Sequence, residues 1–411
     1  DMYYTYYYCN QMKGSPVCGN NVINMSHTYY YCSNLTGDPV CGPNVTNMSW
    51  AYADSRNISG SPVCGPKVKD MSHTYYYGAG IIGNAACGNN VVNMTSTYFY
   101  CQNLTGSAAC GDNVICMTST YYSCKNLAGP PVCGNNVVNM YEAYYSCNKL
   151  TGPPVCGPNV KDFSAAYRGC QNMTGSPVCG DNVISMAGTY WSCNRLTGSP
   201  VCGPNVTDMN YAYSGCINLS GNPVCGPNVT NMASTYSGCT KLTGSAICEE
   251  NVINIHGAYY NCFNIAPNAY FYSNNIQECG SCFGNYMSSR MLNIYVPQNS
   301  TTLDTCLQTG AYHSLVGQSI TWTEDIMNQC YYNTRYNLYI YPVANVREVH
   351  NEHLNAKQIF GIMFYLVGGV ASSEQATVTE GDSYSTEIST TESTLVFISA
   401  SVTMGGVDIS D

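Results

Sequence analysis

Cysteine gives this chain its widest chemical range, because thiolates ligate metals and pairs of thiols form disulfides. The 411 residues include 26 cysteines. A tetrahedral zinc site needs four ligands, and the best candidates are Cys279, Cys282, Cys306 and Cys330. One Cys-x-x-Cys pair with distant partners is a weak zinc signal, and a repeat would itself place cysteines at Cys282 and Cys330. We therefore predict no metal site and no cofactor.

Most other cysteines fall in two regular columns, which bears on disulfide formation. One column recurs every 23 residues from Cys18, and the other starts at Cys9 but has Ser55 and Gly78 in two of its slots. If each unit formed a disulfide between its two cysteines, loss of one cysteine should be accompanied by loss of its partner. The first column nevertheless keeps its cysteine in both of these units, so such pairing is not expected. Cysteines stacked between neighbouring parallel strands would be about 4.8 Å apart, against roughly 3.8 Å between the Cβ atoms of a disulfide. We predict reduced thiols that fill the core.

Other motifs give little support for catalysis. Gly78 and Gly83 bound a match to the dinucleotide-binding fingerprint, but its residues fall in repeat slots and no strand and helix flank it. His350 and His353 lack the spacing of a zinc-binding helix. A regular repeat also offers no deep single pocket in which a pKa could be shifted. The sequence therefore predicts a protein that is not an enzyme.

Charge is scarce, since only 9% of residues are charged and the net charge is −10. Residues 1–265 carry 10 basic and 11 acidic side chains, and the remainder carries 4 and 13. No cluster of Lys and Arg could follow a phosphate backbone, which predicts no nucleic-acid partner. The longest apolar run, 359–371, is shorter than the roughly 18 residues of a membrane span, which predicts no membrane insertion.

A repeat of 23 residues must position all these side chains. Further columns that start at Val22, Met25 and Leu35 are apolar throughout. One unit holds about five apolar positions, too few for a core of its own, so neighbouring units must stack. A tyrosine column recurs without insertion in twelve units, at Tyr6, Tyr29, Tyr52, Tyr75, Tyr98, Tyr121, Tyr144, Tyr167, Tyr190, Tyr213, Tyr236 and Tyr259. We expect this column to point into the core, with each hydroxyl bonded to backbone.

The repeat resembles the BspA-type leucine-rich repeats of bacterial surface proteins, including their NVTNMS variants. The residues that carry the resemblance are a Thr-Tyr or Ala-Tyr pair followed by Cys32, Leu35, Val45 and Met48. The resemblance implies a repeat solenoid that is mainly β. One departure is Gly-x-Pro-Val-Cys where the family has alternating isoleucines, and proline lacks the amide that a central ladder needs. We therefore expect the parallel ladder on the Asn-Val-x-Asn-Met motif instead.

The expected domains follow from where the period stops. Residues 1–265 form the solenoid of about twelve coils, and 266–346 form irregular coils and a cap with strands in its Leu-x-Ile-Tyr and Tyr-x-Tyr segments. Residues 347–358 are expected to be a short helical linker. Residues 359–411 are expected to form an Ig-like β-sandwich that ends before the domain is complete. Their VTMGG-x-DI ending is similar to Ig-like repeats of bacteriophage tail-associated proteins and of surface proteins of Gram-positive gut bacteria.

The column one residue after the core tyrosine is the candidate binding site. If side chains alternate as on an extended segment, it lies outside and forms a strip of stacked rings. Ala53, Arg168, Ser214 and Ser237 occupy four slots, so packing does not dictate the residue type. The alternative is that the rings only cover the junctions between coils. The eight aromatic members, predicted to bind ligand, are Tyr7, Tyr30, Tyr76, Phe99, Tyr122, Tyr145, Trp191 and Tyr260.

These observations predict a non-enzymatic recognition or adhesion module. The resemblance favours an extracellular protein of a bacteriophage virion, a fibre or tail-associated protein, that binds a glycan or protein of the host surface. The alternatives are a structural spacer or decoration protein of a virion, or a bacterial cell-surface adhesin of the same fold. Other virion or cell-surface proteins are expected partners, and the sequence leaves homo-oligomers open.

Overall fold

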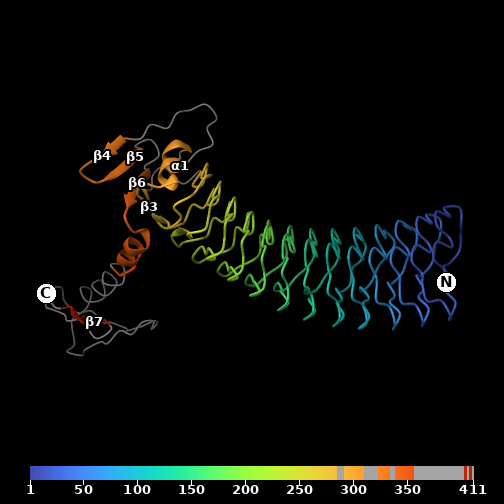
Figure 1. The fold of residues 1–411 in the computed structure, drawn as a ribbon. Helices are drawn as coiled ribbons and strands as arrows, with labels where there is room; N and C mark the ends of the chain where they lie inside the picture. The colour runs from blue at the N-terminus through green and yellow to red at the C-terminus, as the bar shows by residue number, and fades with distance from the viewer. Residues whose placement is uncertain (285–290, 310–322, 334–337, 356–401, 405–406, 410–411) are drawn as a thin grey trace, which may run out of the picture. The chain divides into compact units, whose positions relative to one another are not determined.

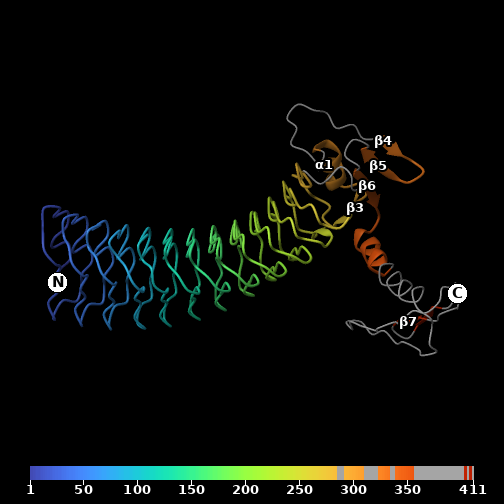
Figure 2. The same cartoon turned by 180° about the vertical axis from the view of Figure 1, so that it is seen from behind.

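The computed structural model shows the coils as a row of similar turns of chain (Figures 1 and 2). The chain divides into two compact units, 1–346 and 347–411. In the first unit, each 23-residue segment makes one coil that lies against the next (Figure 1). The residues that the structure describes are 1–284, 291–309, 323–333, 338–355, 402–404 and 407–409.

Single parallel bridges join neighbouring coils. One bridge per pair of coils uses the second asparagine position of the Asn-Val-x-Asn-Met motif, and this ladder runs without a break from Asn24 and Asn47 to Asn254 and Glu278. Three further bridges, Gly37 to Ile58, Gly60 to Ile81 and Gly221 to Leu242, lie at another position of the coil. The ladder therefore lies on the motif where we expected it. It is only one residue wide, and residues 1–245, all of which are described, contain no strand. A mainly β description of these coils is wrong, because turns replace the strands.

The segment around each core tyrosine is a turn with left-handed residues at two positions, which we call the tyrosine turn. His27 and Tyr31, two residues on either side of Tyr29, have φ angles of 58° and 57°. The amides of these three residues donate to carbonyls of the next coil at 2.8 to 3.0 Å. The amides of Thr28 and Tyr30 instead return to carbonyls three residues earlier. Alternate amides therefore join the coils without an extended backbone.

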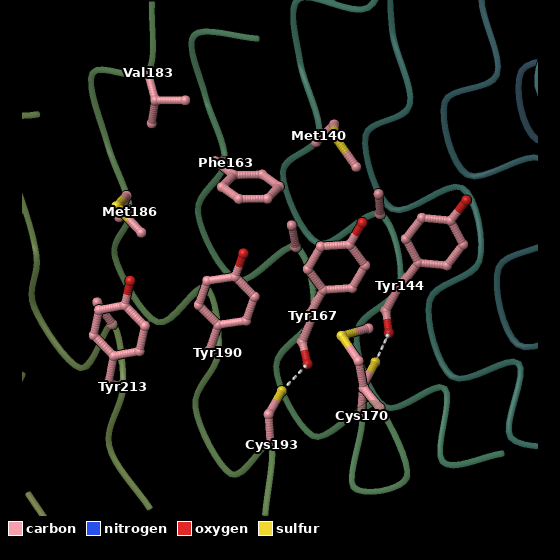
Figure 3. Packing of buried hydrophobic residues seen from close by; sticks show 14 of the residues in the cluster. Met140, Tyr144, Phe163, Tyr167, Cys170, Val183, Met186, Tyr190, Cys193 and Tyr213 are labelled. Carbon is pink, nitrogen blue, oxygen red and sulfur yellow. Dashed lines mark hydrogen bonds between the residues drawn. The ribbon is translucent and has the colours of Figure 1, made fainter. Parts of the chain in front are cut away.

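The core tyrosine column points inward, as predicted, and Figure 3 shows four members in a row. Its members from Tyr29 to Tyr259 are at most 1% exposed, and Tyr6 is half-buried. The hydroxyl of Tyr144 donates to the carbonyl of Val132 at 2.7 Å and accepts from the amide of the same residue at 3.0 Å. One phenol thus satisfies both polar groups of a residue across the coil, which phenylalanine could not do.

The second cysteine column supplies hydrogen-bond donors to the core. The thiols of Cys170 and Cys193 each donate to the carbonyl of a core tyrosine in the preceding coil at 3.0 Å (Figure 3). The hydroxyl of Ser55 makes the equivalent bond to the carbonyl of Tyr29, which explains why serine replaces cysteine there. All 26 cysteines are free thiols in the structure. Gly78 fills one further slot without any side-chain donor, so the position accepts small residues, most of them donors, and does not depend on a disulfide partner.

This donor role predicts different outcomes for two substitutions of Cys124, whose thiol donates to the carbonyl of Tyr98 at 3.0 Å. We expect Cys124→Ser to change the free energy of unfolding little, whereas Cys124→Val, of similar size but without a donor, should cost about 1 kcal/mol. Urea unfolding of both variants measures the difference. Equal stabilities would show that the column only fills space.

The first unit ends in a mixed six-stranded sheet with the order β1-β2-β3-β6-β5-β4. Strands β1, β2, β3 and β6 are parallel, and β5 and β4 continue the sheet antiparallel. Strand β1 begins at Ala246, in the slot that proline fills in most coils, and its register with β2 is still 23 residues. The elements are β1 (Ala246–Cys248), β2 (Asn268–Phe271), β3 (Leu292–Pro297), α1 (Thr301–Thr309), β4 (Thr323–Asp325), β5 (Cys330–Asn333) and β6 (Leu338–Val343).

The strands expected in the Leu-x-Ile-Tyr and Tyr-x-Tyr segments are present as β3 and β6. Residues 346–355 are helical, at the segment expected to be a helical linker. Further along, β7 (Val402–Met404) pairs antiparallel with β8 (Val407–Ile409). The rest of the expected Ig-like domain at 359–411 lies outside the described residues. No helix in the described part of the chain is long and apolar enough to cross a membrane.

Candidate functional site

The eight aromatic residues that follow the core tyrosines all reach the surface, and we call them the aromatic strip. Tyr7 is 40% exposed, and the other seven members are half-buried. The sequence pattern suggested an extended backbone at these residues, but the backbone that turns them outward is not extended. The left-handed residues of the tyrosine turn, on either side of each pair, direct the core tyrosine inward and the next residue outward.

Rings of the aromatic strip stack on one another from coil to coil. The ring centroids of Tyr76 and Phe99 are 4.8 Å apart, those of Phe99 and Tyr122 are 4.6 Å apart, and those of Tyr122 and Tyr145 are 4.5 Å apart. The interplanar angles of these pairs are 9° to 15°. Neighbouring rings therefore cover one another's faces, so a ligand meets mainly ring edges and phenol hydroxyls.

A second set of rings, missed from the sequence, lies two residues before the core tyrosine; we call it the flanking column. Trp50 stacks on His73 at 4.0 Å and 4°, and it also contacts Tyr30 and Tyr76 across the gap left by Ala53. On an extended segment this position would share the inward direction of the core tyrosine. Its positive φ turns it outward instead. The flanking column consists of Tyr4, His27, Trp50, His73 and Tyr211.

The aromatic face carries little charge. Burial, and then the neighbouring Tyr145 and Glu142, raise the pKa of Tyr122 to about 12. Burial also raises the pKa of Tyr76, and it lowers the pKa of the imidazoles of His27 and His73. At neutral pH the phenols are protonated and the imidazoles are neutral. The face therefore offers uncharged hydrogen-bonding groups on rigid rings.

One cation interrupts the aromatic strip. The guanidinium carbon of Arg168 lies 3.6 Å from the ring centroid of Trp191 and 5.2 Å from that of Tyr145. The ring of Trp191 also stacks on Tyr211 of the flanking column at 4.5 Å and 14°. The strip thus continues through Arg168 as a stack of flat groups. Beyond it, two serines separate Trp191 from Tyr260 in the column.

A shallow groove, unanticipated from the sequence, runs along the coils beside a column of asparagines. Its two stretches, about 790 and 680 Å³ in volume, share Lys161 and Asn182. Each asparagine is fixed by a hydrogen bond from its side-chain amide to the preceding coil, as from Asn113 to the carbonyl of Asn89 at 2.8 Å. Exposed apolar side chains such as Ile115 and Ile184 also line the groove.

The four candidate zinc ligands do not form one group. Cys306 is fully buried and shares a hydrogen bond with Cys279, which raises the pKa of the Cys306 thiol. Cys330 lies on β5, where burial and then Asp325 raise the pKa of its thiol and a hydrogen bond with Tyr341 lowers it, and these influences do not include the other candidate cysteines. Within the described ranges, no group of three or more His, Cys, Asp or Glu side chains could hold a metal ion.

Comparison with known proteins gives no family model that matches this chain, and neither a curated protein nor a solved structure matches it. The surfaces described above therefore supply the physical basis for a functional proposal.

Proposed function

We propose that this protein is a non-enzymatic recognition module in which a leucine-rich-repeat solenoid binds a glycan or protein on a host cell surface. In this proposal the protein belongs to a bacteriophage virion, as a fibre or tail-associated component, and acts outside the cell. The resemblance of residues 359–411 to Ig-like repeats of phage tail-associated proteins supports that location. The alternative is that the protein is a bacterial cell-surface adhesin with the same solenoid.

The observation that carries the proposal is the aromatic strip. Its slot in the coil accepts Ala53, Arg168 and Ser237, so the fold does not require an aromatic residue there. Aromatic side chains nevertheless fill most of these slots and remain partly exposed. Tyrosine and tryptophan give large contact areas at a low entropy cost, and they are enriched at recognition surfaces. Prior stacking lowers that cost further, because the rings are already fixed before a ligand arrives.

Simultaneous replacement of Tyr76, Phe99, Tyr122 and Tyr145 by serine tests this role. We expect attachment to purified host envelopes to be lost. Three stacked pairs disappear, so the free energy of unfolding should fall by about 2–4 kcal/mol while the coils stay folded. Pull-down on envelopes measures attachment, and circular dichroism measures folding.

The matched control replaces four apolar groove residues, Val92, Ile115, Val138 and Ile184, by serine. This variant removes a similar amount of apolar surface outside the strip and should still attach. Loss of attachment only in the control would contradict the proposal and assign recognition to the groove.

A structural spacer or decoration role is the second candidate, and the face-to-face stacking favours it. Rings that cover one another can serve mainly to bind each coil to the next. Under this role the strip variant would lose stability yet attach as well as the intact protein. The same attachment experiment therefore distinguishes the recognition role from the structural role.

A further inference from the structure

Arg168 is the only charged member of its column, and rings cover both faces of its guanidinium. The guanidinium lies over the ring of Trp191 at 3.6 Å and over that of Tyr145 at 5.2 Å. Stacking on both sides holds the planar group in one orientation and leaves its edges, which carry the N–H donors, as the accessible part.

Those donors have no protein partner among the described residues. Two other arginines of the coils do have polar partners, since Arg56 forms an ion pair with Asp54 at 3.1 Å and Arg195 donates to Asn172 at 3.2 Å. No such hydrogen bond or ion pair involves Arg168 within the same ranges. The contrast with Arg56 is informative, because Arg56 also lies over a tyrosine ring, that of Tyr77 at 5.7 Å, yet has its acid beside it.

Two acids lie near this site, and the nearer in sequence is Asp162, whose carboxylate accepts a hydrogen bond from the amide of Ser164 at 3.0 Å. Glu142 accepts a hydrogen bond from the hydroxyl of Ser119, in the coil before its own, at 3.2 Å. Arg168 lies in the coil after that of Glu142. Glu142 first, then burial and Asp162, raise the pKa of Tyr141 while Arg168 lowers it, so these charges lie close together. Within the described residues neither acid forms an ion pair or a side-chain hydrogen bond with the guanidinium, whose N–H edge stays available.

We infer that Arg168 binds the carboxylate of an acidic sugar, a uronic acid, in a glycan that lies along the aromatic strip. A guanidinium edge matches a carboxylate with two parallel hydrogen bonds, and this charge-assisted geometry is stronger than a neutral bond. The phenol of Tyr145 lies one coil before Arg168 in the same column, and the partly exposed Ser237 lies three coils after it, so hydroxyls at multiples of the coil spacing accompany the guanidinium and suit the hydroxyls of a sugar chain. The inference rests on the proposed function, since it names the ligand class of the same surface.

The experiment measures binding of the full chain to three uronic-acid polymers, polygalacturonate, alginate and hyaluronan, by surface plasmon resonance. Each is compared with its carboxyl-reduced form, which keeps the sugar chain and removes the charge. We expect at least one acidic polymer to bind about tenfold or more tighter than its reduced form, because a charged hydrogen-bonded pair is lost. Poly-glutamate, which carries carboxylates on a peptide, should bind no better than the reduced polymers.

Arg168→Gln should abolish the preference for the acidic polymer. Arg168→Lys keeps the charge but not the two parallel N–H donors, so it should retain only part of the preference. Arg56→Gln is the matched control and should keep the full preference. A preference that survives in Arg168→Gln, equal binding of poly-glutamate, or no binding of any acidic polymer would overturn the inference. Failure here leaves the envelope-attachment result of the strip variant standing, so the two proposals fail separately.

Discussion

Between pH 9 and pH 11 the protein is expected to lose about 5 kcal/mol of unfolding free energy per pH unit through four thiols alone. Burial raises the pKa of each thiol from 9.0 to about 12 in the folded chain, and the four are Cys101, Cys170, Cys216 and Cys262. The folded state thus keeps protons that the unfolded state releases above pH 9. This stability is fully present below pH 9 and is lost as the pH rises through 12.

Urea unfolding at pH 8, 9, 10 and 10.5 measures this loss. The informative control replaces the four cysteines by serine, whose hydroxyl keeps the donor role seen at Ser55 but does not titrate in this range. We expect the control to retain about 5 kcal/mol per pH unit more stability than the native sequence as the pH rises above 9. A urea midpoint of the native protein that stays constant from pH 8 to pH 10.5 would refute buried, donating thiols.

The second large effect is expected at Tyr144, where alanine should cost about 3–5 kcal/mol, as truncation of other buried aromatic residues does. The side chain is fully buried between Tyr121 and Tyr167, with ring centroids 5.2 and 5.5 Å away. Its phenol is also the partner of both the amide and the carbonyl of Val132. Both the stacking and these hydrogen bonds disappear in the alanine variant.

Tyr144→Phe separates the two contributions, because it keeps the ring and removes the hydroxyl. We expect this variant to lose about 2 kcal/mol of unfolding free energy, since two backbone groups lose their hydrogen-bond partner. Thermal and urea unfolding of both variants supply the values. A loss below 1 kcal/mol for alanine is incompatible with a core position, and a phenylalanine variant as stable as the native chain would show that water replaces the phenol.

Several parts of the fold follow from the period because a buried column in a repeat tolerates few residue types. The inward direction of Tyr29 and its equivalents was predicted on that ground. The ladder at Asn24 and its equivalents was predicted because proline in the other segment lacks the amide that a ladder needs. The strands at β3 and β6 were also predicted, from their alternating apolar residues. In each case the pattern of residue types reports the side-chain environment directly.

The tyrosine turn could not be predicted, because its left-handed positions carry residues that rarely adopt positive φ. In different coils His27, Trp50 and Glu142 occupy one of these slots with φ of 53° to 59°. The sequence hints at the conformation only through scattered glycines, which are Gly188 and Gly257 at this slot and Gly169, Gly215 and Gly238 at the other. Because that conformation was missed, the flanking column was missed with it, and the strip was placed outside for an incorrect reason.

The candidate site could be predicted only in part from the sequence. Aromatic residues at one slot identify a candidate surface, but the sequence does not reveal that adjacent rings cover one another. Nor does it reveal that Arg168 is held between two rings without an ion pair among the described residues. Both properties depend on the separation of neighbouring coils, which backbone hydrogen bonds in the tyrosine turn set.

Those backbone hydrogen bonds all run the same way, since each amide of the turn that leaves its coil donates to the coil that follows. At the tyrosine turn every coil therefore has a donor side and an acceptor side, whatever its side chains, whereas elsewhere in the coil amides such as that of Thr46 donate to the preceding coil. Removal of one whole period would bring together two sides that still match, whereas removal of any other length would not. A change of length in steps of 23 residues would therefore keep the hydrogen bonds between coils matched, and each step would add or delete one position of the aromatic strip without redesign of the core.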